Sequence, residues 1–118
     1  GGLKGEFTVP EKYDGKTINT IEIRDCDGLT GVTAGENIKN LIIRNCDSVN
    51  TLTLPASLEE ITIDSCHALR KVTIDKNNKK LASVYNSVYS KDYRTLYYYA
   101  GYRNQHTGRV IRNRFLCV

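Results

Sequence analysis

The sequence lacks the features that mark several broad classes of protein. It contains no run of 18 consecutive apolar residues, so we predict no membrane-spanning helix. No apolar signal segment follows Gly1, so we expect either a cytosolic chain or the mature form of an exported one. No stretch carries the apolar stripe of an amphipathic helix, which argues against a helical fold.

Catalytic and metal-binding patterns are also scarce. Glycine-rich phosphate loops and Ser-His-Asp patterns are absent, and the two histidines, His67 and His106, are too far apart in sequence to suggest a metal site. Cys66 and His67 are adjacent, and a thiol–imidazole pair can be nucleophilic. However, His67 occupies a turn position that is aspartate in two equivalent segments, so we expect a structural role. We therefore predict a non-enzymatic protein without metal or cofactor.

What the sequence does contain is a 20-residue repeat. Ile21–Cys26 recurs as Leu41–Cys46 and again as Ile61–Cys66. Apolar residues follow at the same spacing, at Leu29, Val49 and Leu69, at Val32, Leu52 and Val72, and at Ala34, Leu54 and Ile74. Self-similarity at such a period is typical of a solenoid, in which each unit buries its apolar face against its neighbours. We predict an all-β solenoid of about three coils.

Each coil is expected to hold two short strands. The first comprises 21–24, 41–44 and 61–64, with residues 21 and 23 and their equivalents pointing inward. The second comprises 32–34, 52–54 and 72–74, and its middle residue is threonine every time. These threonines should form an outward ladder, which Thr8 extends into the first coil.

Three of the four cysteines share one position in successive coils: Cys26, Cys46 and Cys66. Neighbouring coils stack about 4.8 Å apart, but parallel side-chain directions make the dihedral angle of a disulfide difficult to reach. We therefore predict a ladder of buried free thiols that behave as small apolar residues.

We expect a single domain over residues 1–118. Residues 1–20 would form an N-terminal capping coil, with a five-residue insertion within Glu11–Lys16; residues 21–80 hold the repeats, and 81–118 form a hairpin cap and tail. The hairpin is predicted from Val84–Ser90 and Thr95–Ala100, around a four-residue loop. One tyrosine-rich face should cover the last coil, and 110–118 should form a final edge strand.

The pattern I/L-x-I-x-x-C-x-x-L-x-x-V/L-x-L/I resembles that of leucine-rich repeats. The stretch from Ala82 through Ser-Val-Tyr-Asn-Ser-Val-Tyr-Ser-Lys-Asp to Thr95-Leu-Tyr-Tyr-Tyr-Ala-Gly is similar to an insert of BspA-like leucine-rich repeat proteins of bacterial surfaces. The resemblance implies a secreted or cell-surface bacterial protein of adhesin type, with no catalytic role and no cofactor.

The best candidate site is the exposed row beside the first strands. It comprises Glu22, Arg24, Ile42, Arg44, Thr62 and Asp64. Repeat proteins often bind partners on such a face, so we expect a protein partner there. The alternative is a solvated face with Glu22–Arg44 and Arg24–Asp64 ion pairs, each of which contributes little to stability.

The distribution of charge suggests a second site. Residues 1–69 carry 6 Lys/Arg and 11 Asp/Glu, whereas residues 70–118 carry 11 and 2. Such asymmetry can indicate a polyanion-binding end, or an end cap solvated by lysines. The alternative site is a basic and aromatic patch that would bind a polyanion or glycan, with nucleic acid disfavoured: Tyr98, Arg94, Arg103, Arg109, Arg112 and Arg114.

Overall fold

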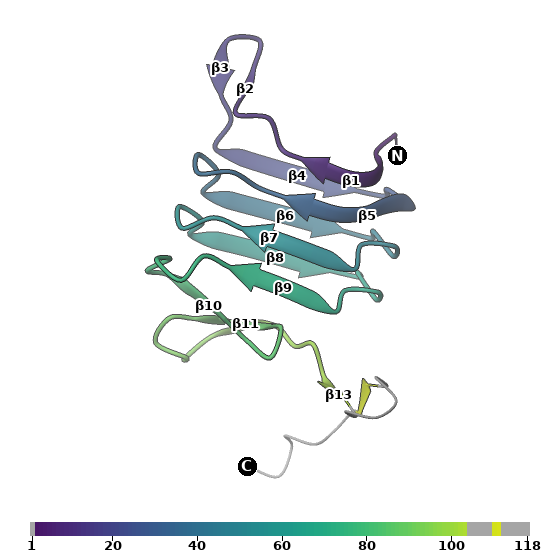
Figure 1. Ribbon diagram of the computed structural model, residues 1–118, viewed down its shortest axis with the longest axis vertical. Helices are drawn as coiled ribbons and strands as arrows, with labels where there is room; N and C mark the ends of the chain where they lie inside the picture. The colour runs from purple at the N-terminus through teal and green to yellow at the C-terminus, as the bar shows by residue number, and fades with distance from the viewer. Residues whose placement is uncertain (1, 104–109, 112–118) are drawn as a thin grey trace.

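The computed structural model describes residues 2–103, 110 and 111. Within this part no residue is helical, and the strands stack as a flattened parallel β-solenoid (Figure 1). The predicted all-β solenoid is therefore confirmed. One sheet consists of β4 (Thr20–Arg24), β6 (Asn40–Arg44) and β8 (Glu60–Asp64). The opposite sheet consists of β1 (Lys4–Thr8), β5 (Gly28–Thr33), β7 (Thr51–Leu54) and β9 (Lys71–Ile74).

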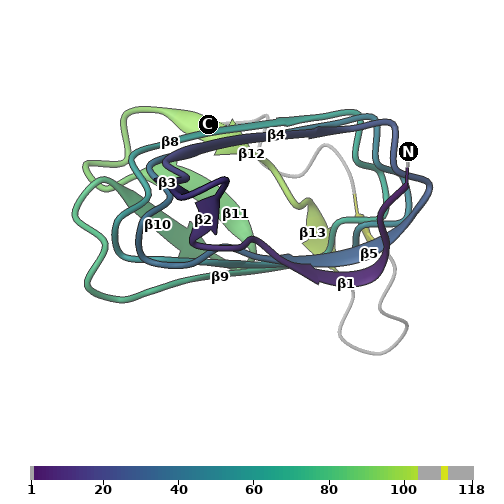
Figure 2. The same cartoon turned by 90° about the horizontal axis from the view of Figure 1, so that it is seen from above.

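The register between coils follows the sequence repeat. Ile21 lies beside Leu41, which lies beside Ile61, and all pairings in the β4-β6-β8 sheet are parallel. Viewed along the stack, the two sheets face each other across a narrow interior (Figure 2). This interior holds the core, and its largest fully buried side chains include Leu29, Leu41, Ile43, Leu52 and Leu58.

A left-handed backbone residue follows the first strand of every coil. Asp25, Asn45 and Ser65 have φ values of 58°, 53° and 54°. Asparagine and aspartate tolerate this conformation better than most residues, which explains why short polar side chains occupy the corner. The Asn45 side-chain amide also donates to the Asp25 carboxylate at 2.7 Å, so the first two corners are joined directly.

The corner directs the next residue, a cysteine, into the core. Cys26, Cys46 and Cys66 are buried free thiols, as predicted. Each thiol lies 3.3–3.4 Å from the carbonyl oxygen two residues earlier. Burial raises the pKa of the Cys46 and Cys66 thiols, which disfavours the reactive thiolate.

We expect these three thiols to resist alkylation in the native state at pH 8 and to react once the chain is denatured. Peptide mapping by mass spectrometry after a maleimide pulse would measure each thiol separately from Cys117. Rapid native labelling of Cys46, the most deeply buried of the three at 0% exposure, would contradict the ladder.

The threonine ladder is present on the outer face of the other sheet. Thr8 pairs with Thr33, Thr33 with Thr53, and Thr53 with Thr73, and all four residues are exposed. The first of these pairings places β1 in the N-terminal coil in the register that the sequence repeat predicts.

The insertion in that coil forms a small hairpin. It consists of β2 (Lys12–Tyr13) and β3 (Lys16–Thr17), joined by Asp14 and Gly15 at φ values of 51° and 77°. Both turn residues have positive φ, which is typical of tight two-residue hairpins. The hairpin rises above β4 at the N-terminal end of the stack (Figure 1).

The C-terminal cap differs from the prediction in one respect. The predicted strand Val84–Ser90 is wrong, because the chain reverses at Tyr85 and Asn86, whose φ values are 49° and 68°. The cap is therefore a three-stranded antiparallel sheet of β10 (Leu81–Val84), β11 (Ser87–Ser90) and β12 (Leu96–Tyr98). The one hairpin that the sequence predicted, around the loop 91–94, is present between β11 and β12. Of the predicted edge strand, β14 (Val110–Ile111) pairs with β13 (Tyr102–Arg103), and residues 112–118 lie outside the described residues.

Side chains rather than a strand ladder attach the cap to the last coil. The Val72 amide donates to the Asn86 side-chain oxygen at 3.1 Å, and the Val72 carbonyl accepts from the Ser83 hydroxyl at 2.6 Å. The Tyr98 hydroxyl donates to the Leu69 carbonyl at 2.7 Å. Tyr98 thus provides the tyrosine contact that covers the last coil.

Asn78 joins the second coil to the cap from within the core. It is 1% exposed, and its amide nitrogen donates to the Pro55 and Leu58 carbonyls at 3.0 and 2.9 Å. Its oxygen accepts from the amides of Lys80 and Leu81 at 2.8 and 2.7 Å. This one side chain therefore links the return turn of the second coil to the start of β10 through four hydrogen bonds.

Candidate partner-binding face

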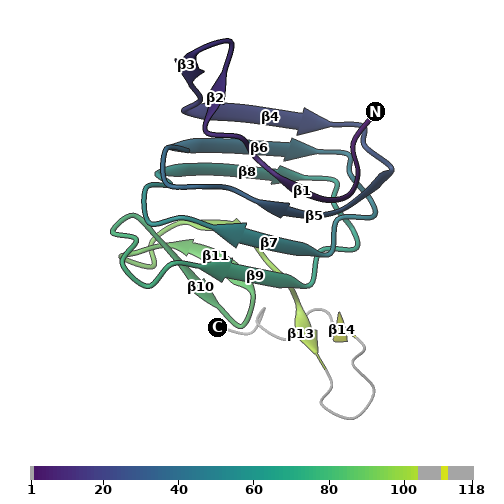
Figure 3. The same ribbon diagram turned by 45° about the horizontal axis from the view of Figure 1, so that its top comes forward.

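The outer face of the β4-β6-β8 sheet brings together the six residues that the sequence singled out. The register aligns Glu22 with Ile42 and Ile42 with Thr62 in one row. It aligns Arg24, Arg44 and Asp64 in the next row. The three strands lie side by side without a register shift, so these two rows form a regular surface (Figure 3). We refer to these six residues as the charged face.

The charges on this face form a connected chain of ion pairs. The Arg24 guanidinium bonds to the Glu22 carboxylate, and this hydrogen bond raises the pKa of Arg24. The same carboxylate lies 4.0 Å from Arg44 Nε, and Arg44 Nη1 lies 3.1 Å from Asp64 Oδ2. The predicted Glu22–Arg44 pair is present. The predicted Arg24–Asp64 pair is wrong, because Arg44 stands between them in the register and takes Asp64 as its own partner.

Ile42 lies at the centre of the charged face and is only half-buried. It is flanked by the Glu22 and Thr62 positions across the sheet. A branched apolar side chain surrounded by charged and hydroxyl groups is the arrangement found at the centre of many protein-binding surfaces. Arg44, which pairs with acids on both neighbouring strands, is 41% exposed and so remains accessible to a partner.

Of the alternative basic and aromatic patch, only Tyr98, Arg94 and Arg103 belong to the described residues, so the patch as a whole stays a prediction. Tyr98 faces the solenoid and donates its hydroxyl to the Leu69 carbonyl, so it is only partly exposed. Arg94 is exposed on the loop between β11 and β12, and Arg103 belongs to β13. The other three arginines, Arg109, Arg112 and Arg114, lie outside the described residues.

Lysines that sequence reasoning had not selected as a site surround the same end. Exposed side chains there include Lys71, Lys76, Lys79, Lys80 and Lys91. The excess of Lys and Arg in residues 70–118 was the sequence signal that could have identified these lysines. This end of the molecule therefore remains basic even though Tyr98 is engaged elsewhere.

The adjacent Cys66 and His67 do not form a pair. The Cys66 thiol lies inside, 3.9 Å from the Ile43 carbonyl, whereas the His67 ring is exposed and its Nδ1 lies 2.8 Å from Asp47 Oδ1. That hydrogen bond lowers the pKa of Asp47. His67 thus bonds to the residue that occupies the same turn position in the previous coil.

We expect His67→Ala to return the Asp47 pKa towards its ordinary value. An aspartate with a depressed pKa stabilises the fold above its unfolded pKa, and this contribution disappears as the pH falls through the folded pKa. NMR titration of the Asp47 carboxyl in both proteins measures the shift. An unchanged Asp47 titration in His67→Ala would contradict the contact.

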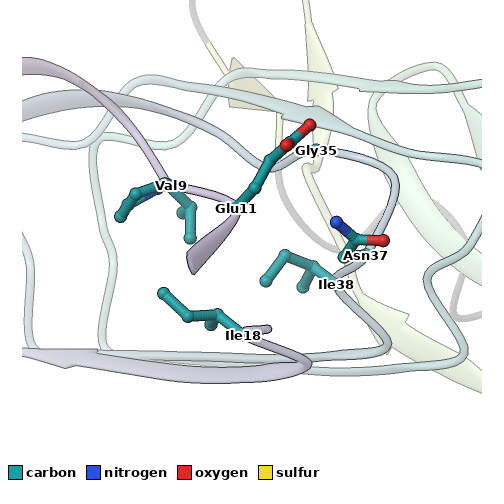
Figure 4. Close-up of a pocket in the computed structure, with 7 residues that line it drawn as sticks. Val9, Glu11, Ile18, Gly35, Asn37 and Ile38 are labelled. Atoms are coloured by element: carbon teal, nitrogen blue, oxygen red, sulfur yellow. The ribbon is translucent and has the colours of Figure 1, made fainter. Parts of the chain in front are cut away.

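A small hollow lies at the N-terminal end, below the base of the β2–β3 hairpin (Figure 4). Val9, Ile18 and Ile38 form its apolar wall, and Glu11 and Asn37 stand at its rim. It encloses about 10 Å³, which is the room of a single water molecule. The hollow is therefore too small to be a ligand site.

The described residues contain no group of three or more His, Cys, Asp or Glu side chains placed to hold a metal ion. No helix long and apolar enough to cross a membrane occurs among residues 2–103, 110 and 111. No protein-family model, curated protein or solved structure matches the chain.

Proposed function

We propose that the protein is a non-enzymatic binding module whose charged face takes a protein partner. The observation that supports this is the half-buried Ile42 at the centre of the Arg24–Glu22–Arg44–Asp64 chain of ion pairs. The strands beneath are fixed by the core, so the face is rigid before a partner arrives. A rigid surface loses little conformational entropy on binding.

The repeat pattern supports a further assignment, to the BspA-like leucine-rich repeat proteins. With it comes a secreted or cell-surface location and a role in adhesion to a host or matrix protein. The encoded sequence preceding Gly1 tests the location, since a secretory or lipoprotein signal there would support it. A native sequence before Gly1 with a different kind of targeting segment would argue against a secreted or cell-surface location.

A matched pair of arginine variants tests the charged face. Ile42 and Thr53 both lie in the middle of a second-coil strand and point outward, but on opposite sheets. We expect Ile42→Arg to weaken binding of a purified host or matrix protein about tenfold or more, because central apolar contacts dominate interfaces. Thr53→Arg should leave the affinity unchanged.

Surface plasmon resonance against a panel of purified matrix proteins would provide the measurement, with circular dichroism confirming that both variants are folded. Equal loss in the two variants, or loss only in Thr53→Arg, would place the binding surface elsewhere.

The exposed lysines favour polyanion binding as a second candidate function. Lys76, Lys79 and Lys80 lie within five residues at the C-terminal end of the stack. We expect heparin affinity to fall steeply with salt and to weaken in the Lys79→Glu/Lys80→Glu variant, because released counterions drive such binding. Lys12→Glu/Lys16→Glu, on the opposite end, is the control. A flat salt dependence would exclude this function.

A further inference from the structure

The two sheets of the solenoid have four edges, and each exposes backbone groups that another strand could pair with. At the C-terminal end both edges are covered. In β9, the Val72 amide donates a hydrogen bond to the Asn86 side chain, and the Val72 carbonyl accepts one from the Ser83 side chain. β12 of the cap lies against β8.

At the N-terminal end, β1 is protected by an irregular backbone. Its register with β5 shifts between Gly5 and Glu6, and Gly5 has a φ value of 65°. A bulge of this kind bends and twists an edge strand, which makes it a poor template for another strand.

β4 has no such protection of its own. Its register with β6 runs without interruption from Thr20 to Arg24. The Asp25 amide donates towards β6, to the Arg44 carbonyl at 3.1 Å. Because backbone groups alternate along a strand, those of Glu22 and Arg24 point away from β6. Among the described strands, none pairs with that side of β4.

The β2–β3 hairpin stands at this edge. It rises above β4 in two views of the stack (Figures 1 and 3), and from above it lies within the outline of the coils (Figure 2). All four of its strand residues are exposed, and Tyr13 is 76% exposed, so the hairpin contributes nothing to the core. Its base is closed by the hydrogen bond from the Ile18 amide to the Glu11 carbonyl, at 2.9 Å.

The hairpin is an addition to an otherwise regular corner. Without Lys12–Lys16 the chain would read Pro10-Glu11-Thr17-Ile18, which aligns without a gap with Pro55-Ala56-Ser57-Leu58 in the second coil and shares its proline, its hydroxyl residue and its final apolar residue. The solenoid can therefore turn this corner without these five residues. Their position above the β4 edge suggests that they act on what approaches it.

We propose that the β2–β3 hairpin is a steric guard that keeps the β4 edge from pairing with a second copy of this chain. Charge complementarity identifies that copy as the partner excluded. Consider two β4 strands, one from each copy, paired antiparallel with Ile23 opposite Ile23. Glu22 of each copy then faces Arg24 of the other copy. One ion pair thus occurs twice about a two-fold axis, as an isologous interface requires.

Deletion of residues 12–16 tests the guard. Sedimentation velocity between about 10 µM and 1 mM should show a monomer for the wild type and a dimer at the upper concentrations for the deletion variant, since the bare β4 edge becomes accessible. In the deletion background, Glu22→Lys should place lysine opposite arginine twice and abolish the dimer. The swap Glu22→Lys/Arg24→Glu should restore it.

A folded deletion variant that stays monomeric at the highest concentration would overturn the proposal. So would a dimer of the deletion variant that is unaffected by Glu22→Lys. The wild type provides a test that does not depend on the deletion variant folding. Self-association of the wild type that Glu22→Lys abolishes and the swap restores would show that the hairpin guards nothing, whereas a wild-type monomer up to about 1 mM supports the guard.

Discussion

Asn78→Ala is expected to lower the free energy of unfolding by about 3–5 kcal/mol. The substitution removes both donors to the Pro55 and Leu58 carbonyls and the acceptor for two amides at the start of β10. A buried polar group left without a partner costs roughly 1–3 kcal/mol, and water would reach only some of these four. Urea denaturation followed by circular dichroism measures the loss.

The neighbouring Asn77 is exposed and provides the matched control. Asn77→Ala should change the stability by about 1 kcal/mol or less, since surface substitutions have small effects. Asn78→Leu separates packing from hydrogen bonding, because Ile38 and Leu58 occupy the same position in the preceding coils. If Asn78→Leu were as stable as the wild type, the hydrogen bonds of Asn78 would not be what attaches the cap.

The second large effect is expected from Ile43→Asn, at about 2.5–6 kcal/mol. Ile43 is 1% exposed in the central strand of the β4-β6-β8 sheet. The change forfeits roughly 1.5–3 kcal/mol of apolar burial and places an amide without a partner in the core, at a further cost of about 1–3 kcal/mol.

Ile42→Asn is the control for that experiment, because the adjacent residue points to the opposite side of the same strand and is only half-buried. Its expected cost is about 1 kcal/mol. The comparison tests the alternation itself. Equal losses at the two positions would mean that residues 42 and 43 are not on opposite faces of a strand.

The repeated segments could be predicted from the sequence because each residue there has a repeated environment. Ile23, Ile43 and Ile63 lie in register with one another and face the same interior, so the sequence period records the geometry directly. The buried cysteines were predictable for the same reason. The six residues of the charged face followed from alternation once the strands were placed.

The ends of the solenoid were less predictable because their residues have no repeated neighbours. Asn78 occupies the position of Ile38 and Leu58, but a polar residue there gives no sequence signal of burial; the structure buries it with four side-chain hydrogen bonds. Tyr85 and Asn86 form a turn inside a stretch that reads as one strand. The sequence did not indicate this turn because tyrosine is rare in a left-handed conformation. The ion pair between Arg24 and Glu22, on one strand, depends on side-chain torsions that the repeat does not encode.

The stacking of the three hexapeptides as parallel neighbours is most directly tested by NMR measurement of contacts between strands. The structure predicts nuclear Overhauser effects that link Asp25 with Arg44 and Asn45 with Asp64, the pairs joined by amide–carbonyl hydrogen bonds of 3.1 and 2.9 Å. Effects that instead connect residues 20–24 to 28–33 in an antiparallel ladder would contradict the solenoid.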